Sequence, residues 1–228
     1  MVGGWGRRFR KTKLYDFATA VPLMIWFGFG GWHDAQNILP HVRRIAAETE
    51  DLIGVLQLIA MVASILFCGL LIAMLVIRSV PRARASGIMP RALAITGTFI
   101  GNGFLYLQPV VLPLWLQTLV VVLVIIGAML GALVIVWLGR SFAVMAEARN
   151  LVTNGPYAIV RHPLYGVEVI GSAAMLIQFF GWTAVGLFLT FVAAQVARTI
   201  FEERILLETF RDYRGYQSRT ARFIPYVY

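Results

Sequence analysis

Four long apolar runs constrain this chain more than any other feature. They lie at about Tyr15–Trp32, Leu52–Ile77, Ala92–Val111 and Pro113–Leu138. A helix that crosses a bilayer needs roughly 20 apolar residues, because each residue rises about 1.5 Å through a hydrocarbon core of about 30 Å. Lipid offers no hydrogen bonds, so the backbone of such a run must satisfy its polar groups within a helix. We therefore expect four membrane-spanning helices here.

Two more apolar runs follow a polar interval. They cover about Val167–Phe180 and Trp182–Ile200, and only Gly181 separates them. The first run reaches roughly 21 Å as a helix, which is short for a full span. We predict an antiparallel helical hairpin whose first arm is tilted or crosses only part of the bilayer. The expected fold is all-α, a polytopic transmembrane helical bundle of five to six spans with a C-terminal helical hairpin and a cytoplasmic cofactor pocket.

The composition supports a membrane protein and argues against two other classes. Hydrophobic residues make up 59% of the chain and charged residues 14%, and the mean hydropathy is +0.77, which is outside the range of ordinary soluble domains. The formal charge of +9 does not indicate a nucleic-acid binder, because such proteins display their cations on a large polar surface. A single cysteine, Cys68, excludes a disulfide framework and a cysteine metal cluster.

The basic residues are distributed unevenly among the loops. Eighteen of the twenty Lys and Arg residues lie before the first span, in segments 78–91 and 139–163, and from residue 198 onwards. Only Arg43 and Arg44 fall on the opposite side. Cytoplasmic loops of membrane proteins carry an excess of Lys and Arg. We therefore expect both termini and both segments to lie in the cytoplasm, and we expect the membrane to be a bacterial inner membrane.

The two halves of the chain differ in polarity. Residues 1–111 contain little besides apolar helices and short loops, and we interpret Gly97 and Gly101 as small residues that let helices pack closely. Residues 112–228 carry polar side chains in and beside membrane helices, where a central charge costs roughly 2.5 to 3.5 kcal/mol. We assign the first part to variable transmembrane helices and the second to a core with a cofactor loop, the hairpin and a tail.

The polar segment before the hairpin has the pattern of a rigid loop. Gly155-Pro156 is a turn signal, and His162 is biased away from helix because a proline follows it. Pro163 suits the first position of the next helix. The hairpin should then bring this loop to the same depth as the far end of the last helix. Seven polar side chains are expected to meet there: Arg161, His162, Tyr165, Glu168, Arg198, Glu202 and Glu203.

An alternative interpretation is purely structural. Arg198 and Glu202 are spaced four residues apart, as are Arg204 and Glu208. Such pairs stabilise a helix by a few tenths of a kcal/mol, and their charged ends extend to the interface between membrane and water. We prefer this interpretation for Arg204 and Glu208, and a functional one for Glu202 and its neighbour Glu203.

Several short motifs resemble one superfamily of membrane enzymes. They are Gly155-Pro156-Tyr157, Arg161-His162-Pro163 with Tyr165, Glu202-Glu203, Phe210 with Tyr213 and Tyr216, and Phe223-Ile224-Pro225. Their order and spacing are similar to those of the isoprenylcysteine carboxyl methyltransferase and phospholipid methyltransferase superfamily, over roughly residues 130–228. Two positions depart from the pattern: Arg149 stands where many relatives have a histidine, and Thr220-Ala221-Arg222 replaces Val-Pro-Arg.

The resemblance implies a site for S-adenosylmethionine and no metal. Arg161 suits the carboxylate of this cofactor, Glu202 or Glu203 its ammonium or ribose, and Tyr157 or Tyr165 its adenine or sulfonium. The expected cofactor-binding residues are Leu151, Val152, Gly155, Pro156, Tyr157, Arg161, His162, Pro163, Tyr165, Glu202 and Glu203. The expected catalytic residues are Glu168, as a base or orienting group, and Arg198.

The function implied by the resemblance is methyl transfer to a lipid-like or prenylated acceptor dissolved in the membrane. Carboxyl O-methylation of the isoprenylcysteine type is the leading expectation. The alternatives are N-methylation of a phospholipid amine, a membrane reductase that uses a nicotinamide cofactor, and a lipid-binding protein without catalysis. The chain lacks the glycine-rich fingerprint of soluble dinucleotide-binding domains. A transporter would show internal repeats and helices broken near mid-membrane, whereas the polarity here is confined to one side and one half.

Overall fold

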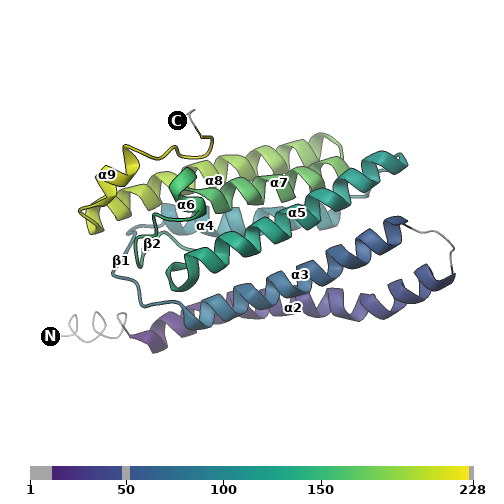
Figure 1. The fold of residues 1–228 in the computed structure, drawn as a ribbon, viewed down its shortest axis with the longest axis horizontal. Coiled ribbons are helices and arrows are strands. Elements are labelled where there is room, and N and C mark those ends of the chain that lie inside the picture. Colours follow the sequence, from purple (N-terminus) through teal and green to yellow (C-terminus); the bar gives the residue numbers. More distant parts are fainter. Residues whose placement is uncertain (1–11, 48–51, 226–228) are drawn as a thin grey trace.

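The computed structural model describes residues 12–47 and 52–225, and these form an elongated bundle of helices with a short strand pair at one end (Figure 1). The helices and strands are α2 (Lys13–Ala47), α3 (Leu52–Ile77), β1 (Ala83–Arg84), α4 (Met89–Phe99), η1 (Ile100–Tyr106), α5 (Leu114–Leu138), η2 (Gly139–Ser141), β2 (Glu147–Ala148), α6 (Pro156–Ile159), α7 (Pro163–Gln178), α8 (Trp182–Thr209) and α9 (Tyr213–Gln217). The expected helical class is confirmed.

Three helices in the described part of the chain are long and apolar enough to cross a membrane. They are α3, the continuous segment Leu114–Ser141 that contains α5, and α8. In the most apolar window of α3 only 11% of the residues are buried inside the protein. The other apolar side chains of α3 are partly or fully exposed, and Leu66 is 69% exposed. Such a surface is stable in lipid and unstable in water, so the protein is an integral membrane protein.

Several predicted helices have different bounds in the structure; α8, for example, continues past the predicted end at Ile200 to Thr209, and two others differ more. The first, α2, continues past the predicted end at Trp32 to Ala47. The helix predicted over Ala92–Val111 ends at Phe99 and is followed by the 3₁₀ segment η1. Glycine lowers helix stability by about 1 kcal/mol relative to alanine. One of the two glycines in η1, Gly103, lies so close to α8 that a Cβ atom there would approach Leu187 Cδ2 to 2.8 Å.

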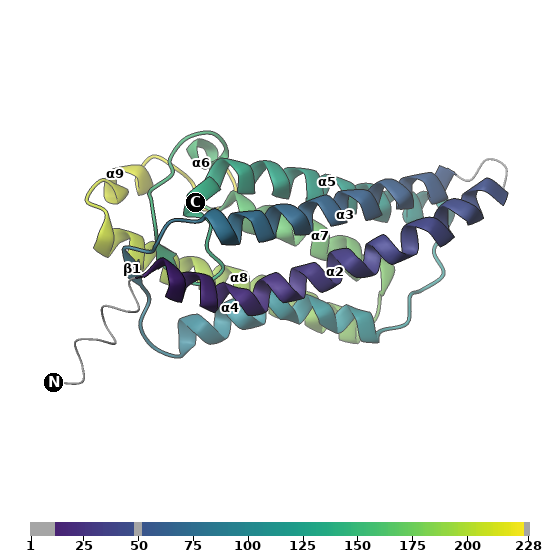
Figure 2. The same ribbon diagram turned by 90° about the horizontal axis from the view of Figure 1, so that it is seen from below.

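The helices are arranged in a ring, in which each helix packs against its neighbours. The hairpin of α2 and α3 packs on α5, α5 packs on α7, α7 on α8, and α8 on α4. Figure 2 shows α4 beside α2 on the remaining side. There Trp26 of α2 meets Phe99 of α4 edge to face, with ring centroids 5.3 Å apart. The hairpin of α7 and α8 is present as predicted, with its turn at Phe179–Gly181.

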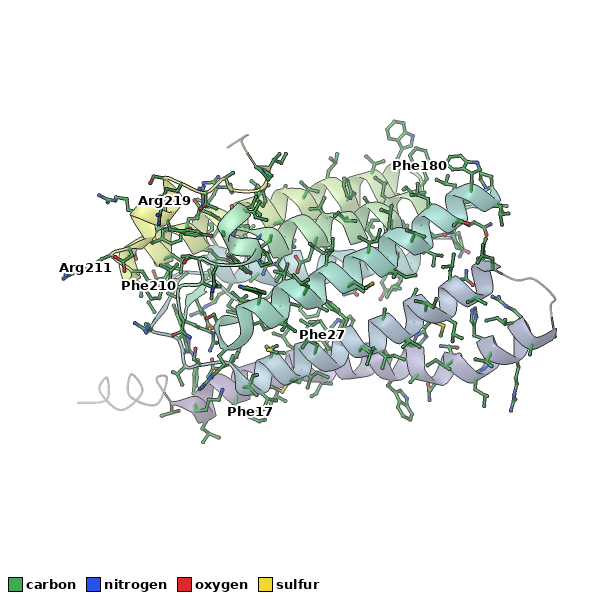
Figure 3. The ribbon with its side chains drawn as sticks, in the orientation of Figure 1. Phe17, Phe27, Phe180, Phe210, Arg211 and Arg219 are labelled. Atoms are coloured by element: carbon green, nitrogen blue, oxygen red, sulfur yellow. The ribbon has the colours of Figure 1, made fainter. Side chains whose placement is uncertain are left out.

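One end of the bundle collects segments that are far apart in the sequence (Figure 1). β1 pairs with β2 in antiparallel register, with Ala83 opposite Ala148. The backbone N–H of Arg161 donates to the carbonyl of Ala221 at 2.8 Å, which ties the loop before α7 to the tail. Figure 3 shows Arg211 and Arg219 at this end and Phe180 at the opposite end. The loops and the tail that we predicted to share one side of the membrane therefore share one end of the molecule.

Candidate functional site

Two cavities lie inside this end of the bundle. The first is a polar cavity beneath the loop and the tail, with about 740 Å³ of space including its mouth. Its walls come from the end of α5, the segment 141–152, α6, and the facing ends of α7, α8 and α9. The polar residues among its lining are Ser141, Glu147, Arg149, Asn150, Tyr157, Arg161, His162, Tyr165, Glu202, Tyr213 and Tyr216.

The second is an apolar cavity deeper in the ring of helices, with about 1030 Å³ of space including its mouth. Every helix of the ring contributes to its walls, and Phe27 of α2 lies midway along the bundle (Figure 3). Aromatic and aliphatic side chains dominate, and the charged residues in its lining are Glu168 and Arg198. Three residues line both cavities: Ala143, Leu164 and Tyr165. The two cavities are therefore neighbours that meet at Tyr165.

The loop that closes the polar cavity is shaped by Gly155. Its φ of +60° is favoured by glycine, and a Cβ atom there would lie 2.0 Å from Cε2 of Trp137. Trp137 Nε1 donates to Asn154 Oδ1 at 3.2 Å, which holds the indole in this position. Pro156 then starts α6, and this turn delivers the buried ring of Tyr157 to the cavity wall. The Gly-Pro-Tyr motif thus allows the loop to pack closely on Trp137 of α5.

Glu203 is the anchor of the tail and the loop. Its carboxylate accepts hydrogen bonds from Arg161 Nε at 2.8 Å, Arg222 Nη2 at 2.8 Å and Gln217 Nε2 at 3.2 Å. His162 Nε2 lies 3.1 Å from its Oε1 atom. The side chain is 5% exposed and does not line the polar cavity. Glu203 therefore holds the loop and the tail together through four side chains and does not face the cavity itself. We refer to Glu203, Arg161, His162, Gln217 and Arg222 as the Glu203 clamp.

Glu202 lies in a different environment although it is the next residue. Its side chain is 20% exposed and lines the polar cavity. Tyr165 Oη donates to its Oε1 atom. The rings of His162 and Tyr165 stack beside it with centroids 5.7 Å apart. The loop and the end of α8 therefore converge as predicted, and the carboxylate that they present to the cavity is that of Glu202.

A chain of polar side chains leads from Tyr165 into the apolar cavity. The guanidinium of Arg198 lies 4.7 Å from the centroid of the Tyr165 ring. Its Nη1 atom donates to Gln195 Oε1 at 2.8 Å, and its Nη2 atom donates to the carbonyl of Val144 at 2.8 Å. Gln195 Nε2 in turn donates to Glu168 Oε2. Arg198 and Glu168, the predicted catalytic pair, therefore lie in the apolar cavity, joined by one amide.

A second group of charges closes the opposite side of the polar cavity, and the sequence analysis missed it. Asp16 of α2 is 0% exposed and accepts from Arg78 Nε at 3.0 Å, from Arg149 Nη2 at 2.7 Å and from Arg84 Nη2 at 3.4 Å. Glu147 also pairs with Arg84 and Arg149. We call these five residues the Asp16 clamp. The sequence did offer one indication of this group, because Asp16 is an acidic residue at the start of an apolar helix. No recognisable motif surrounds Asp16.

Three tyrosines of the polar cavity remain protonated at neutral pH. Burial raises the pKa of the Tyr157 and Tyr213 hydroxyls well above the usual range, and burial raises the pKa of Tyr216 to about 12. The Tyr216 hydroxyl donates to the carbonyl of Tyr157 at 2.6 Å. The buried Tyr213 hydroxyl has no hydrogen-bond partner among the described residues. Buried hydroxyls normally have a partner, so this hydroxyl is suited to a bound ligand.

The structure brings most of the predicted cofactor residues together. Seven of them line the polar cavity: Leu151, Val152, Tyr157, Arg161, His162, Tyr165 and Glu202. Four do not line it and instead shape or anchor the surrounding elements: Gly155, Pro156, Pro163 and Glu203. The residues of its wall that we did not predict include Glu147, Arg149, Tyr213 and Tyr216. Within the described ranges, no group of three or more His, Cys, Asp and Glu is arranged to hold a metal ion.

The chain is similar to known proteins over its second half. Residues 119–209, from α5 to the end of α8, match the model of the isoprenylcysteine carboxyl methyltransferase family. This match confirms the resemblance found in the motifs.

Individual relatives carry two kinds of name. The cobalt-zinc-cadmium resistance protein CzcN of Cupriavidus metallidurans is 31% identical over 113 residues, which is 49% of this chain and 51% of that protein. Protein-S-isoprenylcysteine O-methyltransferase B of Arabidopsis thaliana is 30% identical over 120 residues, which is 50% of this chain and 61% of that protein. A probable protein-S-isoprenylcysteine O-methyltransferase of Oryza sativa is 30% identical over 115 residues, which is 46% of this chain and 59% of that protein. The chain thus spans between about half and three fifths of the length of these relatives.

Proposed function

We propose that the protein transfers a methyl group from S-adenosylmethionine to a lipid-like acceptor, on the premise that residues 119–209 match the model of the isoprenylcysteine carboxyl methyltransferase family. One observation carries the proposal: a polar cavity with an accessible carboxylate and an apolar cavity with a buried arginine meet at Tyr165. A methyltransferase with a membrane-dissolved acceptor needs these two compartments side by side, because its cofactor is polar and its acceptor is not.

The polar cavity fits S-adenosylmethionine in its chemistry. Glu202 has acceptor capacity left beside its bond from Tyr165 and would hold the ammonium. Arg161 uses its Nε and Nη1 atoms in the Glu203 clamp, and its Nη2 atom would meet the carboxylate. The unpartnered Tyr213 hydroxyl would bond a ribose or adenine atom. When bound, this cofactor supplies an electrophilic methyl group on a sulfonium.

The apolar cavity suits an acceptor with a long hydrocarbon chain. We propose that Arg198 holds the acceptor carboxylate by charge-assisted hydrogen bonds, and that this interaction favours O-methylation of the isoprenylcysteine type. With the cofactor bound, the acceptor oxygen would bond to the methyl carbon as the carbon–sulfur bond breaks, and the electron pair of that bond would stay on sulfur. A carboxylate needs no proton transfer in this step. The chain contributes by aligning the acceptor and by excluding water behind apolar walls.

An amine acceptor is the second candidate because Glu168 shares the apolar cavity. A phospholipid amine carries a proton at neutral pH and must lose it before attack. Glu168 would take that proton or orient the ammonium, whereas Arg198 would repel it. The charge of the preferred acceptor therefore decides between the two roles.

We also propose the placement of the protein in its membrane. The chain would form five spans from α2, α3, α4 with η1, α5 and α8, and six when the partial span α7 is included. The end that holds both clamps faces the cytoplasm, in agreement with the excess of Lys and Arg there. A bacterial inner membrane suits this arrangement.

The test uses the full chain purified in detergent. S-adenosylmethionine should raise Tm, because a ligand that binds only the folded state stabilises it by mass action. A radiolabelled methyl group should pass to N-acetyl-S-farnesylcysteine. Glu202→Gln should abolish the rise in Tm, while Glu208→Gln, an exposed position on the same helix, should retain it. A wild-type protein that responds to a nicotinamide instead would favour a reductase, and one that binds without turnover would favour a lipid-binding protein.

A further inference from the structure

The amide of Gln195 connects the two charged residues of the apolar cavity. Gln195 of α8 is 1% exposed. Its side chain lies between Arg198 of the same helix and Glu168 of α7. Its oxygen accepts from Arg198 and its nitrogen donates to Glu168. The reverse orientation of the amide would place an N–H group against a guanidinium and an oxygen against a carboxylate. The two neighbours therefore determine the orientation of the amide, and the amide in turn determines their spacing.

Helix α4 packs against this amide at Gly97. A Cβ atom at Gly97 would lie 2.9 Å from Gln195 Oε1, 3.0 Å from Arg198 Cδ and 3.0 Å from Arg198 Nη1. The absent side chain thus leaves the space in which both polar side chains lie. Gly97 also lines the apolar cavity, together with its neighbour Thr98 and with Gly101. A glycine that we interpreted as a helix-packing residue contacts the polar groups of the candidate acceptor site.

We propose that Gln195 and Gly97 are positioning residues for the methyl acceptor, and that α4 thereby makes the N-terminal half of the chain a determinant of acceptor alignment. The proposal rests on the proposed function, because it takes Arg198 and Glu168 as the groups that meet the acceptor. Gly97 provides the space, Gln195 sets the distance between the two charges, and Val144 holds the other side of the guanidinium through its carbonyl.

The chain offers a matched pair of variants, one in α4 and one in η1, which follows it directly. Gly97→Ala introduces a methyl group that would crowd the side chains of Gln195 and Arg198, and the three atoms nearest to it all belong to these two residues. The helix should remain intact, since alanine is a better helix former than glycine. Gly101→Ala introduces the same methyl group four residues later in the wall of the same cavity, where nothing lies within 4 Å of its position. The two variants differ in whether Gln195 and Arg198 are displaced.

A third variant separates the polar role of Gln195 from its packing role. Gln195→Met retains nearly the same volume and removes both hydrogen bonds. A side chain that only fills space would tolerate this change. A side chain that positions Arg198 and Glu168 would not.

The experiment measures kcat and KM for N-acetyl-S-farnesylcysteine, and in parallel the rise in Tm caused by S-adenosylmethionine. Gly97→Ala and Gln195→Met should each lower kcat/KM for the acceptor by about tenfold to a hundredfold, the range expected for a misplacement near 1 Å. The rise in Tm should persist in both variants, and Gly101→Ala should lower kcat/KM by less than Gly97→Ala.

Two failures are distinguishable. A wild-type protein that neither gains stability from S-adenosylmethionine nor methylates an acceptor overturns the proposed function and this inference with it. A wild-type protein that methylates the acceptor while Gly97→Ala and Gln195→Met do so equally well overturns the inference alone. Equal losses in Gly97→Ala and Gly101→Ala would also overturn it, because cavity volume and not alignment would then explain the effect.

Discussion

The Glu203 clamp and the Asp16 clamp are similar in structure but differ in how visible they are in the sequence. Each gathers cations around a buried carboxylate, and together they border the polar cavity, with Glu147 and Arg149 on one side and Arg161 and His162 on the other. The Glu203 clamp joins segments within the last third of the chain and coincides with recognisable motifs. The Asp16 clamp joins residues up to 133 positions apart and has no motif. A buried charge network is therefore evident from sequence only when its members are close together.

The clamps also differ in what they hold. The Glu203 clamp ties a loop and a tail to α8, and two of its donors also line the cavity. The Asp16 clamp ties α2 to the segment 78–84 and to β2, so it connects the two halves of the chain. The Ser79 carbonyl takes part as well, because Arg149 Nη1 donates to it. The first clamp should therefore matter most for ligand binding and the second for folding.

The largest expected effect comes from Asp16→Asn. The change leaves Arg78 and Arg149 buried with only Glu147 to compensate their charge, and breaking a buried ion pair costs about 3–5 kcal/mol. Thermal unfolding in detergent should show a marked fall in Tm or loss of folded protein. Asp34→Asn on the same helix, where the carboxylate is partly exposed, should unfold like the wild type. An unchanged Tm for Asp16→Asn would show that the Asp16 clamp does not connect the halves.

A smaller loss is expected for Glu203→Gln. The neutral amide keeps some hydrogen bonds of the clamp but leaves Arg161 and Arg222 without their counter-ion, at a cost of about 2–3 kcal/mol. The rise in Tm with S-adenosylmethionine should also weaken, because Arg161 and His162 lose their orientation. If Glu203→Gln retains the full ligand response while Glu202→Gln loses it, the clamp is only structural.

The smallest effect is expected for Arg222→Ala. This side chain is 18% exposed and is one of four partners of Glu203. Water screens part of its charge, so we expect a loss of about 1 kcal/mol or less in the free energy of unfolding. Arg219→Ala, an exposed change in the same tail, is the control and should be neutral. A loss for Arg222→Ala as large as for Glu203→Gln would mean that the tail is held by this one arginine.

Much of the fold could be predicted because its signals are local. Apolar length predicted α3, α5 and α8, and Gly181 between two apolar runs predicted the hairpin. The helix predicted over Ala92–Val111 was partly wrong, because apolar composition does not distinguish an α-helix from a shorter helix followed by a 3₁₀ segment. Whether the chain forms five or six spans stays a prediction.

The candidate site was predicted in part. The loop motif and the paired acids do converge, and seven of the predicted residues line one cavity. Their separation into a polar and an apolar cavity was not predicted, because it depends on which side of Tyr165 each side chain points. Asp16 was missed, and Gly97 was predicted only as a helix-packing residue, for a related reason: their partners come from other parts of the chain, and a single residue in an apolar helix carries no sign of its distant contacts.

The sequence by itself determined that this protein lies in a membrane, that its basic segments gather at one end, and that a Gly-Pro-Tyr loop meets an acidic pair on α8. These properties follow from composition, local turn chemistry and helix periodicity. Only the tertiary structure decided that Glu202 faces the cavity while Glu203 is surrounded by donors of its own chain. Adjacent residues of a helix point about 100° apart, and the packing of the loop and the tail around α8 determines which direction is the cavity and which is the protein interior.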